Sequence, residues 1–235
     1  KYFFTITRLV EQFKSFGVKA KQVACAFDHT VILTTDGEVL TCGVGEYGRL
    51  GTGQNSDALK PLPVDTLANE NIVSVSTGEY HSLALSDKGV LYSWGRNDRG
   101  QLGHSDSNID LYSMESYPRA VELPGKVKHI AAGIARSACV TETGDLFVWG
   151  HRFGHIPLSI DKALYAGAKI TKLVCGGQTS RNTVVFLSDD GNLWRLGTKK
   201  SGLIGESEEE GPEKFKLSHI KNPKVLDVSA GFGQH

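Results

Sequence analysis

The string GVGEYG, from Gly43 to Gly48, is the first place in this 235-residue chain where residue types and spacing could do chemistry. In a dinucleotide-binding fold, Gly-x-Gly-x-x-Gly holds a pyrophosphate at the N-terminus of a helix. Here no amphipathic helix follows the glycines, and the equivalent string GRNDRG lacks the middle glycine. No phosphate-binding loop with Gly-Lys-Ser/Thr occurs either. We therefore expect no cofactor and no ATPase or kinase activity.

The cysteines and histidines are the other candidate reactive groups. No Cys-x-x-Cys pair is present, so the cysteine spacing predicts neither a zinc site nor a redox site. A histidine acting as general base needs a nucleophile or carboxylate beside it, and the sequence places none there. Instead, these residues occupy fixed positions of an internal repeat, which indicates packing: Cys25, Cys42, Cys139, Cys175, His29 and His81. We expect no metal and no disulfide.

The repeat is visible as four stretches that align without gaps: VILTTDGEVLTCG, LALSDKGVLYSWG, ACVTETGDLFVWG and VFLSDDGNLWRLG. Their central glycines are Gly37, Gly89, Gly144 and Gly191, separated by 52, 55 and 47 residues. A second glycine follows six residues later in each: Gly43, Gly95, Gly150 and Gly197. Turn residues between two apolar runs predict a β-hairpin in every unit.

Each hairpin is preceded by a short apolar strand and followed by a loop rich in glycine and an outer strand. Four strands make one blade of a β-propeller, and one blade cannot bury both faces of its sheet alone. Periods near fifty residues are typical of propeller blades. The sequence therefore predicts an all-β fold of about four four-stranded blades.

At these residues the chain resembles the regulator of chromosome condensation family, whose repeat carries Gly-x-x-His-Ser/Thr, a hairpin, Trp-Gly and Gly-Gln-Leu-Gly. The second unit matches best, with Gly78, His81, Ser82, Gly89, Trp94, Gly95, Gly100, Gln101, Leu102 and Gly103. Other units depart from the pattern: Arg136 and Thr183 stand at the histidine position, and Cys42 and Leu196 at the tryptophan position. The resemblance implies a ring of seven blades.

We expect one propeller domain over residues 1–235, of which the chain forms an arc. The expected divisions are the outer part of a preceding blade at 1–22, four units at 23–74, 75–128, 129–172 and 173–224, and the inner strand of a further blade at 225–235. Because both ends then fall inside blades, we expect the natural protein to be longer. A partner covering the two open edges is the alternative.

Repetition assigns a first set of residues to architecture. Histidines at one repeat position are expected to bond neighbouring backbone, and the tryptophans to pack between blades. The expected structural residues are His29, Gly37, Gly43, Gly78, His81, Gly89, Trp94, Gly95, Gly144, Trp149, Gly150, Gly191 and Gly197.

The segments outside the repeat are the candidate contact surface, because rigid scaffolds place recognition on their loops. The insertion 104–117 mixes acidic, aromatic and apolar residues, and 206–214 is densely acidic. The expected partner-binding residues are Asp98, Asp106, Asp110, Leu111, Tyr112, Met114, Tyr117, Glu206, Glu208, Glu209 and Glu210. The alternatives are an insertion folded onto its own blade and an acidic loop that is merely solvated.

These observations favour a non-catalytic scaffold that binds other proteins, including multiprotein complexes. The resemblance implies an alternative, a guanine-nucleotide exchange factor for a small GTPase. The 26 basic residues balance the 26 acidic ones, so no broad positive field favours direct nucleic-acid binding. No apolar run approaches the roughly 20 residues that span a bilayer. Without a signal peptide, we expect an intracellular protein, whether cytoplasmic, nuclear or organellar.

Overall fold

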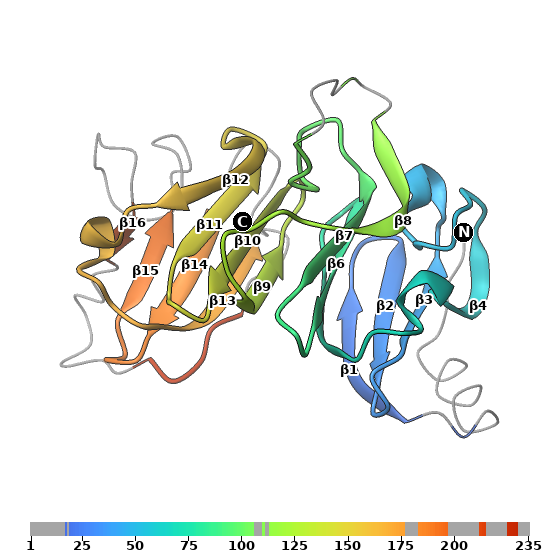
Figure 1. Cartoon of the computed structure of the whole chain (residues 1–235), viewed down its shortest axis with the longest axis horizontal. Coiled ribbons are helices and arrows are strands. Elements are labelled where there is room, and N and C mark those ends of the chain that lie inside the picture. The colour runs from blue at the N-terminus through green and yellow to red at the C-terminus, as the bar shows by residue number, and fades with distance from the viewer. Residues whose placement is uncertain are drawn as a thin grey trace.

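The structure is a computed structural model that describes residues 17, 19–105, 110, 113–176, 183–196, 212–214 and 225–229. It contains four antiparallel sheets of four strands each, which follow one another in chain order as an arc (Figure 1). Within every sheet the strands are paired in sequence order, so each sheet is a simple meander. The all-β propeller fold predicted from the repeat is confirmed. A ring of seven blades stays a prediction.

We number the sheets as blades 1 to 4. Blade 1 comprises β1 (Ala20–Cys25), β2 (His29–Thr34), β3 (Val39–Gly43) and β4 (Ala58–Pro63). Blade 2 comprises β5 (Ile72–Thr77), β6 (His81–Ser86), β7 (Leu91–Arg96) and β8 (Met114–Ala120). Blade 3 comprises β9 (Val127–Ala132), β10 (Arg136–Thr141), β11 (Leu146–Gly150) and β12 (Gly154–Ile160). Blade 4 comprises β13 (Ile170–Gly176), β14 (Thr183–Ser188), β15 (Leu193–Leu196) and β16 (Pro212–Lys214).

Three short 3-10 helices lie in the connections: η1 (Glu46–Gly48), η2 (Asp65–Leu67) and η3 (Lys162–Tyr165). Among the described residues, no helix has the length and apolarity needed to cross a bilayer. The first strand of each blade begins two or three residues before the expected unit starts at 23, 75, 129 and 173. Residue Gly197 and the region 1–16 lie outside the described residues.

The core lies between blades, because successive side chains of a strand point to opposite faces of its sheet. Each of three apolar clusters combines one face of a blade with the facing side of the next. The cluster between blades 1 and 2 contains Val31, Leu33, Val39, Val64, Leu67, Ile72, Val75, Ala84 and Trp94. The clusters between blades 2 and 3 and between blades 3 and 4 are built in the same way. A blade therefore depends on its neighbours for burial of its apolar side chains.

Backbone hydrogen bonds also link successive blades. The N–H of Ile72, which opens β5, donates to the Gly37 carbonyl at 3.0 Å, and Val127 donates likewise to Gly89 at 2.9 Å. The N–H of Val225 donates to Gly191 at 3.2 Å. Residues 225–229 form no strand. They begin at the place where the inner strand of a next blade would start.

The outer strand of every blade carries proline. Proline has no N–H to offer and is confined to strand edges, where it hinders pairing with another chain. These prolines are Pro61 and Pro63 in β4, Pro118 in β8, Pro157 in β12 and Pro212 in β16. The rim of the arc is thereby protected against strand addition.

Two glycines separate the cost of backbone strain from the cost of a steric clash. Gly95 has φ +108°, and a Cβ there would lie 2.4 Å from the Tyr80 carbonyl oxygen. Gly144 has φ +82°, and a Cβ there would meet nothing within 4 Å. We expect Gly144→Ala to lower the free energy of unfolding by roughly 1–2 kcal/mol through strain alone. Gly95→Ala should cost about 3 kcal/mol or more. Urea unfolding of both variants measures the difference, and equal losses would contradict it.

Candidate functional site

Antiparallel pairing sends the connections of each blade to two opposite ends of its sheet. We call one end the loop face; it is formed by the connections 26–28, 44–57, 78–80, 133–135 and 151–153 and by the described part of 97–113. The other end, the hairpin face, is formed by 35–38, 64–71, 87–90, 121–126, 142–145, 161–169 and 189–192. Every described contact residue expected from the sequence lies on the loop face or on β8, which begins there.

A repeated set of hydrogen bonds joins blades 1 and 2 beneath the loop face. The Ser82 hydroxyl donates to the Arg49 carbonyl at 3.0 Å, and Trp94 Nε1 donates to the same carbonyl at 3.0 Å. His29 Nε2 lies 2.9 Å from Ser82 Oγ. All four residues are buried. We call this arrangement of histidine, serine, loop carbonyl and tryptophan the inter-blade latch.

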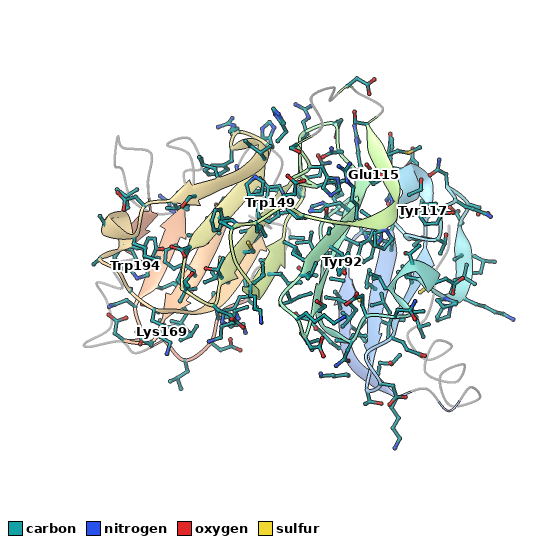
Figure 2. All side chains as sticks on the ribbon, in the orientation of Figure 1. Tyr92, Glu115, Tyr117, Trp149, Lys169 and Trp194 are labelled. Carbon is teal, nitrogen blue, oxygen red and sulfur yellow. The ribbon has the colours of Figure 1, made fainter. Side chains whose placement is uncertain are left out.

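The same latch joins blades 2 and 3. Ser137 Oγ and Trp149 Nε1 both donate to the Gln101 carbonyl, at 2.8 and 3.0 Å. His81 Nε2 lies 2.8 Å from Ser137 Oγ. Figure 2 shows Trp149 between these two blades. The accepting residue belongs to the GRLG or GQLG string of one blade, and the donors belong to the next blade.

The latch fixes the protonation of its histidines. Because each serine gives its proton to the loop carbonyl, the histidine must donate from Nε2, which leaves Nδ1 unprotonated. Nδ1 of His29 and of His81 is buried and has no hydrogen-bond partner. Burial lowers the pKa of His29 to about 3, with further lowering from Arg49 and His81, and burial lowers the pKa of His81 to about 3. Both imidazoles are neutral structural groups.

A serine, a histidine and a glutamate lie together in blade 2 in an order that invites comparison with a hydrolase triad. Ser93 Oγ is 3.0 Å from His104 Nε2, and His104 Nδ1 is 4.0 Å from Glu115 Oε1. Ser93 is fully buried, however, and its hydroxyl donates to the Leu102 carbonyl at 2.7 Å. Thr41 makes the same bond to Leu50 at 2.7 Å in blade 1. This serine therefore closes the loop and is unavailable as a nucleophile.

Two arginines and two tyrosines form a cluster on the loop face between blades 1 and 2. The Arg49 guanidinium lies 4.7 Å from the Tyr80 ring centre, and that of Arg96 lies 4.6 Å from the Tyr47 ring centre. The two rings meet edge to face at 5.9 Å. Arg49 Nη1 and Arg96 Nε are buried without a hydrogen-bond partner, so the ring faces are the groups that stabilise them. Burial lowers the pKa of Arg49, and Glu46 opposes that shift.

Sequence reasoning missed this cluster. Tyr47 has φ +60°, an uncommon conformation for a tyrosine, and it is this backbone turn that brings its ring to the arginines. The only signal was local: GEYGRLG in blade 1 and GEYH in blade 2 both carry tyrosine.

The expected contact residues differ in what they present to solvent. The Asp98 side chain is only 3% exposed and pairs with Arg96 at 2.7 Å and with Arg99 at 3.7 Å. Asp110 is exposed, and its carboxylate accepts from the Ser113 hydroxyl at 3.2 Å. Asp98 therefore organises its own loop, whereas Asp110 faces solvent.

Met114 and Tyr117 belong to β8 and not to a loop, because the strand begins at Met114. They are 41% and 54% exposed. Tyr117 lies against Gly53 of blade 1, and the Gly53 N–H donates to the Ser116 carbonyl at 2.8 Å. Figure 2 shows Glu115 and Tyr117 on this strand. The remaining expected contact residues lie outside the described residues: Asp106, Leu111, Tyr112, Glu206, Glu208, Glu209 and Glu210.

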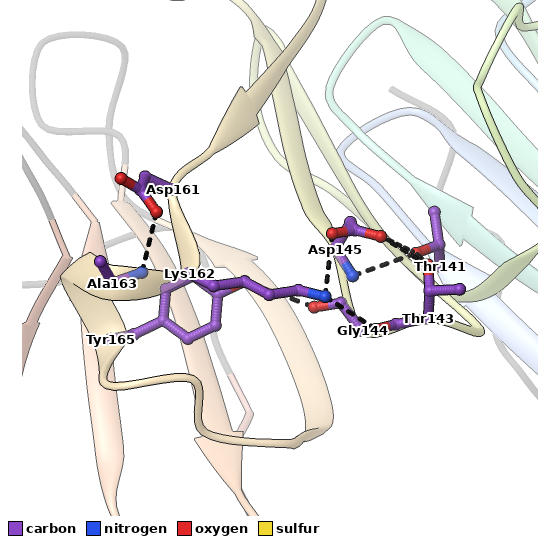
Figure 3. A network of polar contacts seen from close by, with 8 residues as sticks. All are labelled: Thr141, Thr143, Gly144, Asp145, Asp161, Lys162, Ala163 and Tyr165. Atoms are coloured by element: carbon purple, nitrogen blue, oxygen red, sulfur yellow. Dashed lines mark hydrogen bonds and ion pairs between the residues drawn. The ribbon is translucent and has the colours of Figure 1, made fainter.

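The hairpin face carries a polar network in blade 3 (Figure 3). Lys162 pairs with Asp145 at 2.9 Å and donates to the Thr143 carbonyl at 2.9 Å. The Tyr165 hydroxyl donates to the Gly144 carbonyl at 3.3 Å. The Thr143 hydroxyl and Lys162 lower the pKa of Asp145. These bonds hold η3 onto the hairpin between β10 and β11, so the network is part of the scaffold.

Removing a latch hydroxyl should destabilise the fold. We expect Ser137→Ala to lower the free energy of unfolding by about 1–3 kcal/mol, because it leaves His81 Nε2 buried without an acceptor. Ser159→Ala, at an exposed position of β12, should change it by less than about 0.5 kcal/mol. Urea unfolding measures both, and a Ser137 variant as stable as the Ser159 variant would refute the latch.

The buried histidines predict a pH dependence. The unfolded chain titrates these imidazoles near pH 6.5, and the folded chain at about pH 3. The unfolded chain therefore binds more protons between these values, and stability is lost as pH falls from about 6.5 towards 3. Each histidine contributes at most about 1.4 kcal/mol per pH unit. His81→Asn should reduce the slope of unfolding free energy against pH, measured between pH 7 and pH 4. An unchanged slope would count against buried neutral histidines.

Comparison with known proteins agrees with this architecture. A family model described as "Regulator of chromosome condensation (RCC1) repeat" matches residues 36–85 and 88–140, and a second model of the same description matches 20–49 and 72–101. The ultraviolet-B receptor UVR8 of Arabidopsis thaliana is 34% identical, over 92% of this chain and 50% of its own length. The regulator of chromosome condensation of Drosophila melanogaster is 34% identical, over 81% of this chain and 36% of its own length.

Solved structures show the same fold. Human WBSCR16 superimposes with a TM-score of 0.77 at 25% identity, over 91% of this chain and 56% of that structure. Prp20p of Saccharomyces cerevisiae, described with its binding properties to Gsp1p and histones, gives 0.75 at 21% identity over 92% and 54%. The chain spans about half the length of these proteins or less. On the repeat matches and these relatives, the chain belongs to the regulator of chromosome condensation repeat family.

Proposed function

We propose that this chain is a non-catalytic scaffold that binds other proteins through its loop face. The observation that carries the proposal is the combination of rigidity and exposure on that face. Two latches hold the loops of blades 1 to 3 in fixed positions, and Met114 and Tyr117 present apolar surface at the edge of the same loops. Partially exposed methionine and tyrosine on a fixed platform are typical of protein contact surfaces.

The printed descriptions of relatives support protein partners. Prp20p is described as binding Gsp1p and histones, and a further structure shows Kap60 bound to it. Several relatives are ligases of the HERC group, in which the matched part covers a small share of the length, 4% in human HERC2. The shared element across these proteins is the propeller, and binding is the activity that the propeller itself supports.

A matched pair of variants tests the surface. We expect Met114→Glu to weaken capture of partner proteins by at least about tenfold, because a charge at the centre of a contact is poorly tolerated. Leu164→Glu is the control, since Leu164 is 51% exposed but lies in η3 on the hairpin face. Quantitative affinity capture with the full-length protein measures both variants. If the two variants lose the same partners, or neither loses any, the loop face is not the contact surface.

Guanine-nucleotide exchange on a small GTPase is the second proposal. Its support is the likeness to regulators of chromosome condensation and the exposed Asp110 on the loop face. An exchange factor must bind the nucleotide-free GTPase more tightly than the loaded form, which requires contacts near the phosphate and magnesium site. Catalytic amounts of the full-length protein should then accelerate release of labelled GDP from a small GTPase, and Asp110→Asn should reduce the acceleration. No acceleration across a panel of GTPases would exclude this activity.

A further inference from the structure

The contact between blades 3 and 4 lacks the residues of the inter-blade latch. At the three side-chain positions where blades 2 and 3 supply histidine, serine and tryptophan, this contact has Arg136, Val184 and Leu196. Valine and leucine have no side-chain hydrogen-bond donor. The Ser and Trp donors of the latch are therefore chemically absent here, whatever conformation the neighbouring loops adopt.

The arginine at the histidine position turns back onto its own blade. Arg136 Nη2 donates to the His151 carbonyl at 2.9 Å, and its guanidinium lies 4.4 Å from the Phe153 ring centre. Both acceptors belong to the connection 151–153 of blade 3. In the other two contacts the residue at this position reaches across to the next blade. Arg136 thus strengthens blade 3 internally.

Apolar packing holds blades 3 and 4 together. Phe186 stacks on Trp194 with ring centres 6.1 Å apart, and Tyr165 meets Phe186 edge to face at 5.5 Å. The Cys175 thiol approaches the Ala131 carbonyl at 3.7 Å, which is a weak hydrogen bond. By contrast, Gln22 both donates to and accepts from Val75 between blades 1 and 2, at 2.8 and 3.1 Å. Apolar contact is non-directional, so it permits sliding that hydrogen bonds resist.

We propose that the contact between blades 3 and 4 is a hinge, at which blade 4 moves as a unit against a rigid body made of blades 1 to 3. The hinge lets the loops of blade 4 change their orientation relative to the latched part of the loop face. This proposal does not depend on the proposed function. The position of blade 4 at one end of the arc is matched by blade 1 at the other, which is latched to its neighbour.

Hydrogen exchange of the unaltered chain is the first test. Each lost hydrogen bond shifts an opening equilibrium by about fivefold, so amides of β13 and β14 should exchange at least about tenfold faster than those of β5 and β6. Strands β1 and β2 are the matched control, because they belong to the other end of the arc. Equal exchange in blades 1 and 4 would show an end effect and overturn the hinge.

Tryptophan fluorescence provides the second test, because the chain has three tryptophans and each lies at a different contact between blades. Figure 2 shows Trp194 in blade 4. Two chains with a single tryptophan, made by Trp→Phe changes, retain either Trp94 or Trp194. We expect acrylamide to quench Trp194 several-fold more strongly than Trp94. Adding Ser82→Val, which copies the residue found at 184, should raise the quenching of Trp94 towards that of Trp194.

A disulfide should lock the hinge. A Cβ at Gly133 in blade 3 would lie 3.1 Å from Cys175 Cβ in blade 4, close to the roughly 3.5–4.5 Å of a disulfide. Gly133 is not among the glycines with positive φ, so cysteine fits its backbone. In a Cys25→Ser background, oxidised Gly133→Cys should slow exchange of β13 and β14 to the rate of β5 and β6, and reduction should reverse this. Exchange that stays fast with the disulfide formed would refute the hinge; if no disulfide forms, the exchange and quenching comparisons decide.

Discussion

The backbone carbonyl that accepts two donors from the next blade is the interaction on which the rest of the structure depends. Apolar packing alone brings two sheets together but specifies neither their rotation nor their register. The Arg49 and Gln101 carbonyls, each bound by a serine hydroxyl and an indole N–H, fix one blade against the next at the loop face. The neutral histidine completes the set and excludes water from it.

The sequence predicted the blades well because a repeat constrains many positions at once. The hairpin glycines, the strand order and the burial of the tryptophans all follow from the alignment of four units, since each position is tested several times. The histidine partner was less predictable. Neighbouring backbone was expected, yet His29 bonds the hydroxyl of Ser82, a residue 53 positions away. That pairing depends on how one blade is rotated against the next, which no single unit encodes.

Contact residues were harder to anticipate for a different reason. Acidic residues in a loop were read as contact groups, but the Asp98 carboxylate is enclosed by Arg96 and Arg99, two residues before and one after it. The tyrosine and arginine cluster depends on the positive φ of Tyr47, and non-glycine residues give no reliable sign of that conformation in sequence. Composition indicates which residues are polar; it does not indicate which of them satisfy one another.

The latch also has a consequence for how such a chain changes over evolutionary time. Each unit contributes the accepting carbonyl and the histidine towards the following unit, and the serine and tryptophan towards the preceding one. Duplication of a complete unit therefore creates a new junction that is functional at once. Loss works in the same coupled way, because once one half of a junction mutates, selection no longer maintains the other. Arg136, Val184 and Leu196 stand together at one junction, as this shared fate predicts.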